Sequence, residues 1–276
     1  MNIKIESYIN EMIAKMESND IPLWDSGLIY SSKYNPISKT NYKGFNILLL
    51  SFFSNENFFV TFKQAQSKKL HIKAGSKSLP IVYFEFLKKI DKETGIEKSI
   101  PMLKYYNVFG WDCIEESEEK KKLTPESNSE IESISMPEIE SYIANTKAII
   151  KESSSGAYYK PSSDEIYIPE VKRYKTIQDR FHTIFHELLH WTGHESRLKR
   201  IDMILNFTEK DIYSKEELTA EIGSGVLSAR FNIGNLDRET AYCKSWCKYL
   251  KDNKMQLISA SNKALAGIEY LDGLQV

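Results

Sequence analysis

The stretch TIQDRFHTIFHELLHWT, residues 176–192, decides the fold and the chemistry of the C-terminal half of the chain. Its apolar residues recur every three or four positions, which predicts an amphipathic helix. Gly193 follows directly, and glycine commonly ends helices. His186 and His190 are four residues apart, so they lie one above the other on one helix face. Two imidazoles at this spacing can bind one metal ion, and zinc accepts nitrogen ligands in tetrahedral geometry.

Glu187 lies between the two histidines, about 100° around the helix from His186. Its carboxylate can therefore reach a metal-bound water rather than the metal itself, which is the position of a general base. Zinc lowers the pKa of its bound water to about 7, so a carboxylate can take the proton at neutral pH. The pattern predicts a catalytic centre with Zn²⁺ as cofactor, or with Mn²⁺ or another divalent metal in its place.

A catalytic zinc centre needs a third protein ligand. His194 would continue the row of histidines, but the helix is expected to end at Gly193. Glu217 and Glu221 are four residues apart on the next predicted helix, residues 215–231. One of them can bind the metal while the other accepts a hydrogen bond from a ligating imidazole. We favour Glu217 as the ligand and Glu221 as the hydrogen-bond partner, with the reverse assignment left open.

Three further expectations concern the surroundings of this centre. Glu216 is rotated away from its neighbour by about 100° and is expected to face solvent. The small residues Gly223-Ser224-Gly225 would let the second helix approach the first closely. A predicted hairpin, residues 157–159 and 165–168, would supply an edge strand that can hold an extended peptide by main-chain pairing. Its tyrosines could stabilise an oxyanion, although tyrosines at strand positions are more often packing residues.

The remaining pattern divides the chain into two domains of an α+β protein. Residues 115–136 are rich in Glu and Ser and carry no aromatic residue, so they are predicted to be a flexible acidic linker. Residues 137–276 are expected to form a mostly helical domain with a small sheet, in which the first helix runs to about Glu152. Residues 1–114 are expected to form an N-terminal α/β domain.

The N-terminal domain is predicted to combine one helix with short strands. Residues 2–18 have apolar residues at helical spacing. Five β-rich runs, separated by clusters of Gly, Asn and Ser, follow at residues 45–53, 58–62, 70–72, 81–86 and 104–109. The first run is ambiguous, because periodicity alone does not distinguish a short apolar strand from a buried helix.

Charge is unevenly distributed, although the formal net charge is only −1. Residues 31–90 hold ten lysines against two acidic residues, and aromatic residues lie among the lysines. Cationic grooves with stacking rings bind single-stranded nucleic acid without sequence preference. Because the first arginine is Arg173, bidentate reading of guanine has no basis in this half. Lysine contacts to phosphate predict binding that weakens with salt.

Length and composition exclude several other classes of protein. With 276 residues, of which 41% are hydrophobic and 27% charged, the composition is that of a globular protein rather than a disordered one. The longest uncharged apolar run, residues 47–53, is far shorter than the roughly 18 residues of a membrane span. Glu6 interrupts the region where an export signal would be apolar. We therefore expect a cytoplasmic protein with no membrane partner.

Both halves resemble the family of ArdC-type antirestriction proteins, which occur on conjugative plasmids and other mobile elements. The N-terminal likeness lies in Pro22-Leu23-Trp24, Pro36 through Asn46, Thr61-Phe62-Lys63-Gln64-Ala65, Lys73-Ala74-Gly75-Ser76-Lys77 and Tyr105 through Phe109. In the C-terminal half, His186–Arg200 and Glu216–Glu221 resemble the family's zincin-like metallopeptidase domain. The interval from His190 to Glu217 is also similar to that of ImmA-like peptidases.

The resemblance implies that the first domain binds single-stranded DNA and protects incoming DNA from restriction enzymes. It also implies a metal site at His186, His190 and a downstream glutamate. We predict that nine residues of the matching stretches contact DNA: Trp24, Tyr42, Lys43, Asn46, Phe62, Lys63, Gln64, Lys73 and Lys77. Gly110-Trp111 stands where the family usually has an Asn, so part of the DNA surface is expected to differ.

Three functions are compatible with these features. The first is an antirestriction protein that binds single-stranded DNA and has a competent zinc peptidase domain for a protein or peptide substrate. The second is a regulatory metallopeptidase that cleaves a repressor or a host defence protein, with DNA serving only to localise it. The third is a non-catalytic DNA-binding protein in which the metal only stabilises the fold. Glu187 disfavours the third, because a structural metal does not need a base.

Overall fold

The computed structural model describes residues 3–19, 33–90, 97–125, 135–200, 210–233 and 239–275. The described helices are α1 (Ile3–Asn19), α2 (Phe45–Phe53), α3 (Phe62–Ser67), α4 (Glu118–Leu123), α5 (Met136–Asn145), α6 (Ile177–Thr192), α7 (Lys210–Arg230), α8 (Glu239–Asp252) and α9 (Lys254–Asp272). The described strands are β1 (Tyr34–Asn35), β2 (Thr40–Asn41), β3 (Phe59–Val60), β4 (Leu79–Ile90), β5 (Glu97–Gly110), β6 (Ile149–Ser153), β7 (Tyr158–Lys160) and β8 (Glu165–Pro169).

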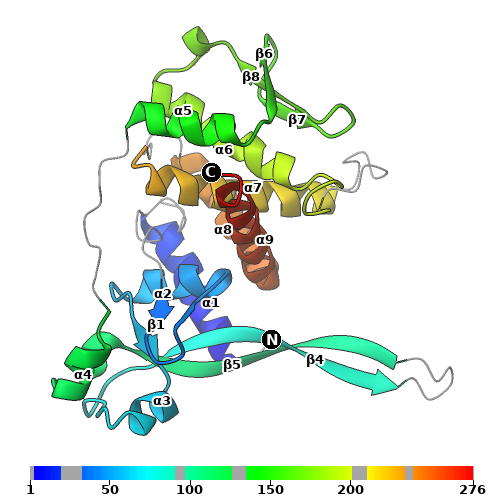
Figure 1. The fold of residues 1–276 in the computed structure, drawn as a ribbon. Coiled ribbons are helices and arrows are strands. Elements are labelled where there is room, and N and C mark those ends of the chain that lie inside the picture. Colours follow the sequence, from blue (N-terminus) through cyan, green and yellow to red (C-terminus); the bar gives the residue numbers. More distant parts are fainter. Residues whose placement is uncertain are drawn as a thin grey trace.

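The described strands form three small sheets. β1 pairs with β2, and β3, β5 and β4 form an antiparallel sheet in that order. In the C-terminal half the order is β6-β8-β7, with β6 parallel and β7 antiparallel to β8. The predicted hairpin is therefore confirmed as β7 and β8, and β7 lies at the edge of its sheet. Figure 1 shows this sheet and the ribbon of β4 and β5 at opposite ends of the molecule.

Residues 45–53, which the sequence leaves ambiguous between a strand and a buried helix, form helix α2. Phe45, Leu48 and Leu49 are buried, and their spacing is that of one helix face. Gly44 precedes the helix with φ 58°, a left-handed conformation that suits glycine. The apolar run is buried on a helix face rather than in a strand, which is the alternative that periodicity left open.

The other N-terminal runs form shorter or longer elements than expected. Only Phe59–Val60 of the run 58–62 is a strand, since Thr61 begins α3 with a capping box that it shares with Gln64. The run 70–72 contributes a single bridge, between Ile72 and Ile114. By contrast, β4 and β5 extend well beyond the predicted runs and pair over twelve positions.

Helix α5 is shorter than expected, because it ends at Asn145 rather than near Glu152. Residues 149–153 form β6, which pairs in parallel with β8. Lys147 lies between the helix and the strand with φ 56°, and a right-handed helix does not continue through that conformation. The chain therefore turns here and supplies a third strand.

The expected linker, residues 115–136, is helical in part. Its described beginning contains α4, in which Lys120 is buried. The Lys120 ammonium donates to the Ile114 carbonyl at 2.9 Å and pairs with Glu116 at 2.6 Å. Residues 126–134 lie outside the described residues. The domain boundaries at residues 114 and 137 stay a prediction.

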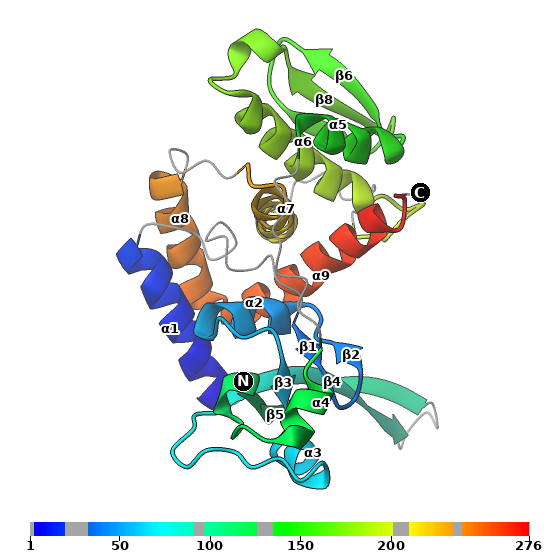
Figure 2. The same ribbon diagram turned by 60° about the vertical axis from the view of Figure 1, so that its left-hand side comes forward.

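One hydrophobic core includes residues of both halves. Buried side chains of α1 and α2 belong to the same cluster as those of α6, α7 and α9. Helix α9 packs against α7, α6 and α2, and α1 packs against α8 (Figure 2). The Phe45 N–H donates to the Asn262 side-chain oxygen at 2.9 Å, and Lys43 pairs with Glu269 at 2.9 Å. Helix α9 thus joins the N-terminal elements to the helices of the C-terminal half.

Candidate metal centre

Helix α6 forms where the sequence predicts it and ends at Thr192, before Gly193. At its start, the Thr176 hydroxyl accepts from the Asp179 N–H and the Asp179 carboxylate accepts from the Thr176 N–H, both at 3.1 Å. This capping box satisfies backbone donors that the first turn leaves free. The apolar face of the helix, which includes Leu188 and Leu189, is buried. The opposite face presents the two histidines.

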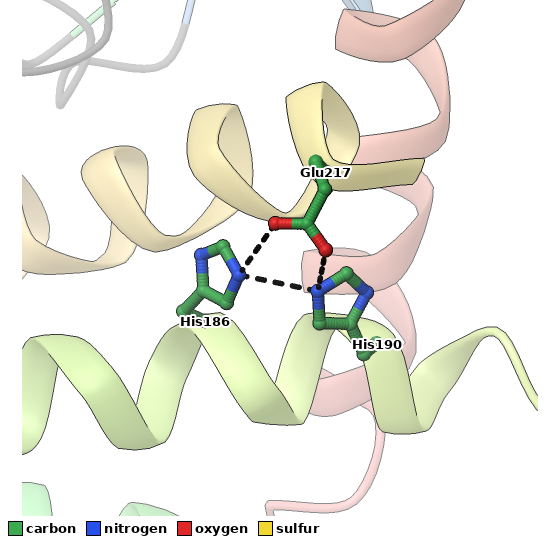
Figure 3. A group of neighbouring side chains, drawn as sticks. All are labelled: His186, His190 and Glu217. Carbon is green, nitrogen blue, oxygen red and sulfur yellow. Dashed lines mark hydrogen bonds and ion pairs between the residues drawn. The ribbon is translucent and has the colours of Figure 1, made fainter. Parts of the chain in front are cut away.

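His186, His190 and Glu217 converge on one point between α6 and α7 (Figure 3). The Nε2 atoms of the two histidines are 3.1 Å apart. The Glu217 carboxylate lies 3.4 Å from His186 Nε2 through one oxygen and 3.3 Å from His190 Nε2 through the other. Two ligand atoms about 2.05 Å from a tetrahedral zinc lie about 3.3 Å from each other. The donor spacings therefore fit a single ion of this size.

Two glycines let the helices approach closely enough for this arrangement. A side chain at Gly223 of α7 would lie 2.5 Å from Cγ of Leu189, and one at Gly267 of α9 would lie 2.7 Å from its Cδ1. Both contacts are closer than real side chains show, so each position admits only glycine without rearrangement. The expected close approach at Gly223 is confirmed, whereas Gly267 was not predicted.

The outer nitrogen of each imidazole faces a further carboxylate. His186 Nδ1 is 3.1 Å from Glu221, the partner that the sequence predicts for a ligating imidazole. His190 Nδ1 is 3.7 Å from Glu216. The expectation that Glu216 faces solvent is wrong, because its side chain is buried and pairs with Arg200 at 3.0 Å. Arg200 lies in the turn after α6 and draws this carboxylate inward.

The buried carboxylates favour positive charge at the histidines. Burial lowers the pKa of His186, but Glu217 and Glu221 outweigh it and hold the net pKa well above its ordinary value. For His190, burial is likewise outweighed by Glu216 and Glu217, which raises the pKa to about 9. Burial raises the pKa of Glu217, yet the two imidazoles bring the net value well below the ordinary range. A divalent cation could replace the protons that this cluster attracts.

Glu187 is buried beside these residues with an oxygen that lacks a partner. Within the described part of the chain, its Oε2 has no hydrogen bond. Burial raises the pKa of Glu187 and outweighs the neighbouring His190 and His186, which lower it. Leaving a buried acceptor without a hydrogen-bond donor costs free energy. This oxygen can therefore accept a hydrogen bond from a water or take a proton from a substrate. Glu187 lines a cavity of about 320 Å³. The same cavity is lined by His186, His190 and Glu217, by Ala157 and by the β7 residues Tyr158 and Tyr159.

Strand β7 is held beside the cavity by a contact that the sequence did not reveal. The Arg197 guanidinium lies 3.8 Å from the centre of the Trp191 ring at the end of α6. It also binds both oxygens of Asp164 in the turn between β7 and β8. Tyr159 donates to Asp164 at 2.8 Å. The edge strand is therefore tied to the helix that carries the histidines.

Four of the nine predicted DNA contacts have partners within the protein, and one of them, Lys43, keeps 72% of its side chain exposed. The Tyr42 ring is buried and its hydroxyl donates to the Phe59 carbonyl. The Asn46 amide bonds both backbone groups of Val82 at the free edge of β4. Gln64 caps α3, and Lys43 pairs with Glu269. Burial removes Tyr42 as a stacking ring, and backbone bonds occupy Asn46 and Gln64.

The other predicted DNA contacts lie at the surface or outside the described residues. Phe62 is 58% exposed at the start of α3, and Lys63 and Lys77 are exposed. Lys73 is exposed, with its ammonium donating to the Asp112 carbonyl at 2.8 Å. Trp24 lies outside the described residues. Only the exposed members of the prediction keep side chains that DNA could reach.

Comparison with known proteins defines the class of each half. Residues 137–263 match the family described as zincin-like metallopeptidase, so the second half is a zincin-like domain. Residues 4–109 match the N-terminal domain of anti-restriction factor ArdC. The chain therefore has the two-domain α+β organisation of ArdC-type antirestriction proteins, and the expected family and fold class are confirmed. No described helix has the length and apolar character that crossing a membrane requires.

Solved structures and sequence relatives agree with this assignment. The antirestriction ArdC protein of plasmid R388 in its Mn(II)-bound form is 27% identical, with a TM-score of 0.75 over 100% of this chain and 99% of that one. Its metal-free form is 28% identical, with a TM-score of 0.73 over 100% and 98%. A DNA primase TraC of Escherichia coli is 29% identical over 94% of this chain and 26% of its own length. The chain thus spans about a quarter of that relative. An uncharacterized protein of Sinorhizobium fredii, y4eC, is 23% identical over 98% and 92%.

Proposed function

We propose that this protein acts for a mobile genetic element by binding single-stranded DNA with its N-terminal half and hydrolysing a protein or peptide substrate with its C-terminal half. The observation that carries the proposal is the convergence of two imidazoles and one carboxylate. Beside them lies a buried carboxylate oxygen that has no hydrogen-bond partner among the described residues. The ArdC-type order of the two domains supports the combination.

His186, His190 and Glu217 would hold the metal. Two nitrogens and one oxygen suit Zn²⁺, and Mn(II) is the ion in the similar R388 structure. A divalent ion at this point supplies a water of lowered pKa and polarises the scissile carbonyl. Glu187 would accept the proton at Oε2, the carboxylate oxygen that has no hydrogen bond among the described residues. The edge of β7 can pair with an extended peptide and lay it along the cavity.

Surface lysines support the DNA-binding part. Lys63, Lys68, Lys69 and Lys77 are exposed, and none forms an ion pair with another described residue. Phe62 adds an exposed ring to the same stretch of chain. Cations for phosphate together with a ring for a base are what sequence-independent binding of single strands uses. The affinity should therefore fall steeply as salt is added.

Metal analysis combined with DNA titration tests both parts on the same samples. We expect wild type and Glu187→Gln to retain one divalent ion per chain after gel filtration, and His190→Ala and Glu217→Ala to lose it. All four proteins should bind single-stranded DNA equally, because the lysines lie outside the metal centre. Retention of the ion by Glu217→Ala would reject Glu217 as a ligand, and absence of single-strand binding in wild type would reject the DNA-binding part.

Glu187→Gln should retain the metal and lose hydrolysis. A general base contributes about 10²–10⁴-fold to rate, so cleavage of a fluorogenic peptide library should fall by that factor. Glu195→Gln, at an exposed position outside the cavity, is the control and should cleave normally. If the metal only braced the fold, Glu187→Gln would be silent, while His186→Ala would lower the melting temperature.

A further inference from the structure

The ribbon of β4 and β5 carries tyrosines on one face that the core does not cover. The register places Tyr83 opposite Lys104 and Ile81 opposite Tyr106. Since side chains alternate between the two faces of a strand, Tyr83, Lys104 and Tyr106 share one face. Where the ribbon joins the body of the protein, the same face carries Ile81, whose side chain is buried. Figures 1 and 2 show the ribbon running from there away from the helices.

The two tyrosines are exposed and lie against each other. Tyr83 is 41% exposed and Tyr106 is 40% exposed. Their ring centres are 5.7 Å apart, with the planes inclined by 53°. Neither hydroxyl has a hydrogen bond to another described residue. Aromatic rings of this size normally contribute to a core or an interface. Here both rings are partly exposed on one face of the ribbon.

The described part of this face also carries a cation. Lys104 lies directly opposite Tyr83 in the register and belongs to the same face as the two rings.

We propose that Tyr83 and Tyr106, together with Lys104, form a platform on which unpaired bases of single-stranded DNA stack while Lys104 contacts a phosphate. The proposal rests on the proposed DNA-binding function and adds a surface that the sequence did not indicate. Rings and lysines together favour a nucleic acid over a peptide, since every base has a π-face and every linkage a negative charge. A duplex does not fit, because its bases are already stacked.

Fluorescence anisotropy with labelled oligo(dT) tests the platform on the full chain. We expect the double variant Tyr83→Ala and Tyr106→Ala to bind about tenfold or more weakly, since each stacked base contributes substantially to affinity. The corresponding double Phe variant keeps both rings and should stay within about twofold of wild type. Tyr105→Ala, on the opposite face and 36% exposed, is the matched control and should also bind normally. Lys104→Ala should lower the slope of log affinity against log salt by about 0.7.

Each outcome bears on a different claim. If wild type binds oligo(dT) and the double Ala variant binds equally well with an unchanged circular dichroism spectrum, the platform is refuted while the proposed DNA binding stands. If Tyr105→Ala loses as much affinity as the double Ala variant, the assignment of the face is wrong. If wild type binds duplex DNA as tightly as the single strand, stacking is refuted. If wild type binds no DNA, the proposed function itself fails.

Discussion

The imidazole of His190 is held by a chain of charged side chains that begins at Arg200. The Arg200 guanidinium donates to the Leu189 carbonyl at 2.6 Å and to the Thr192 hydroxyl at 3.0 Å, so it also secures the last turn of α6. It binds Glu216, whose other contact is His190 Nδ1. Carboxylates behind ligating histidines fix the ring orientation and raise its basicity. Arg200 and Glu216 therefore position the ligand without reaching the metal point.

Glu216→Gln should weaken metal binding without removing a ligand. Loss of such a partner costs about 10–100-fold in metal affinity, and we expect the lower end because the gap to His190 is 3.7 Å. Competition against a chromophoric chelator measures the change for Zn²⁺ and Mn²⁺. Glu195→Gln serves as the control. Equal affinity of Glu216→Gln and wild type would show that the buried carboxylate only neutralises Arg200.

The burial of Lys33 predicts a pH dependence in the N-terminal half. Its ammonium donates to the Glu56 carbonyl at 2.8 Å and to the Asn57 side chain at 3.3 Å, and burial lowers its pKa to about 8. Between pH 8 and the ordinary lysine value, the unfolded chain binds more protons than the folded one, so stability rises with pH through that window.

Comparison of Lys33→Met with wild type isolates this effect. The difference in unfolding free energy between the two proteins, from urea titrations at about pH 7.5 and pH 9.5, should shift in favour of wild type at the higher pH. A difference that does not change with pH would contradict the assignment of the lowered pKa to Lys33.

At the scale of the elements, the side chain of Leu189 in α6 packs against both α7 and α9. Gly223 and Gly267 both lie against its side chain. We expect Gly223→Ala to lower the free energy of unfolding by about 1–3 kcal/mol through overpacking, a cost that exceeds the roughly 1 kcal/mol that alanine gains in helix propensity. Urea titrations measure the change. Gly156→Ala, where a Cβ meets nothing within 4 Å, should be neutral.

A double-mutant cycle separates this clash from other causes. In a Leu189→Ala background the methyl group at position 223 finds room, so Gly223→Ala should cost less than it does in wild type. An unchanged cost would place the strain elsewhere on α7.

The elements that local patterns determine could be predicted, and those that distant contacts determine could not. The period of residues 176–192 predicts α6, and the spacing of Glu217 and Glu221 predicts two of the three carboxylates of α7 that face the histidines. The burial of Glu216 depends on Arg200, which lies outside that helix. The sequence predicts a DNA contact at Asn46, but its amide instead bonds the backbone of β4 at Val82. Its role follows from the packing of α2 beside that strand.

At the scale of the whole molecule, the shared core predicts that metal binding stabilises both halves together. Among the described residues, the polar contacts that join α1 and α2 to the C-terminal helices include Lys254 with Glu6 at 2.7 Å, Lys251 with Glu17 at 2.7 Å, and the Phe45 N–H with Asn262 at 2.9 Å. With buried residues of both halves in one cluster, unfolding one half would expose apolar surface of the other. The halves should therefore unfold in one cooperative transition.

Hydrogen exchange with and without Zn²⁺ tests this cooperation. A ligand at 100 times its Kd stabilises the native state by about 2.7 kcal/mol, which slows globally exchanging amides by about 100-fold. We expect amides near Val108 of β5, far along the chain from the metal centre and fully buried, to slow as much as those of α6. His190→Ala should abolish the effect at both places. If slowing is confined to α6 and α7, the two halves open independently. The interface through α9 would then be too weak to transmit the free energy of metal binding to the N-terminal sheet.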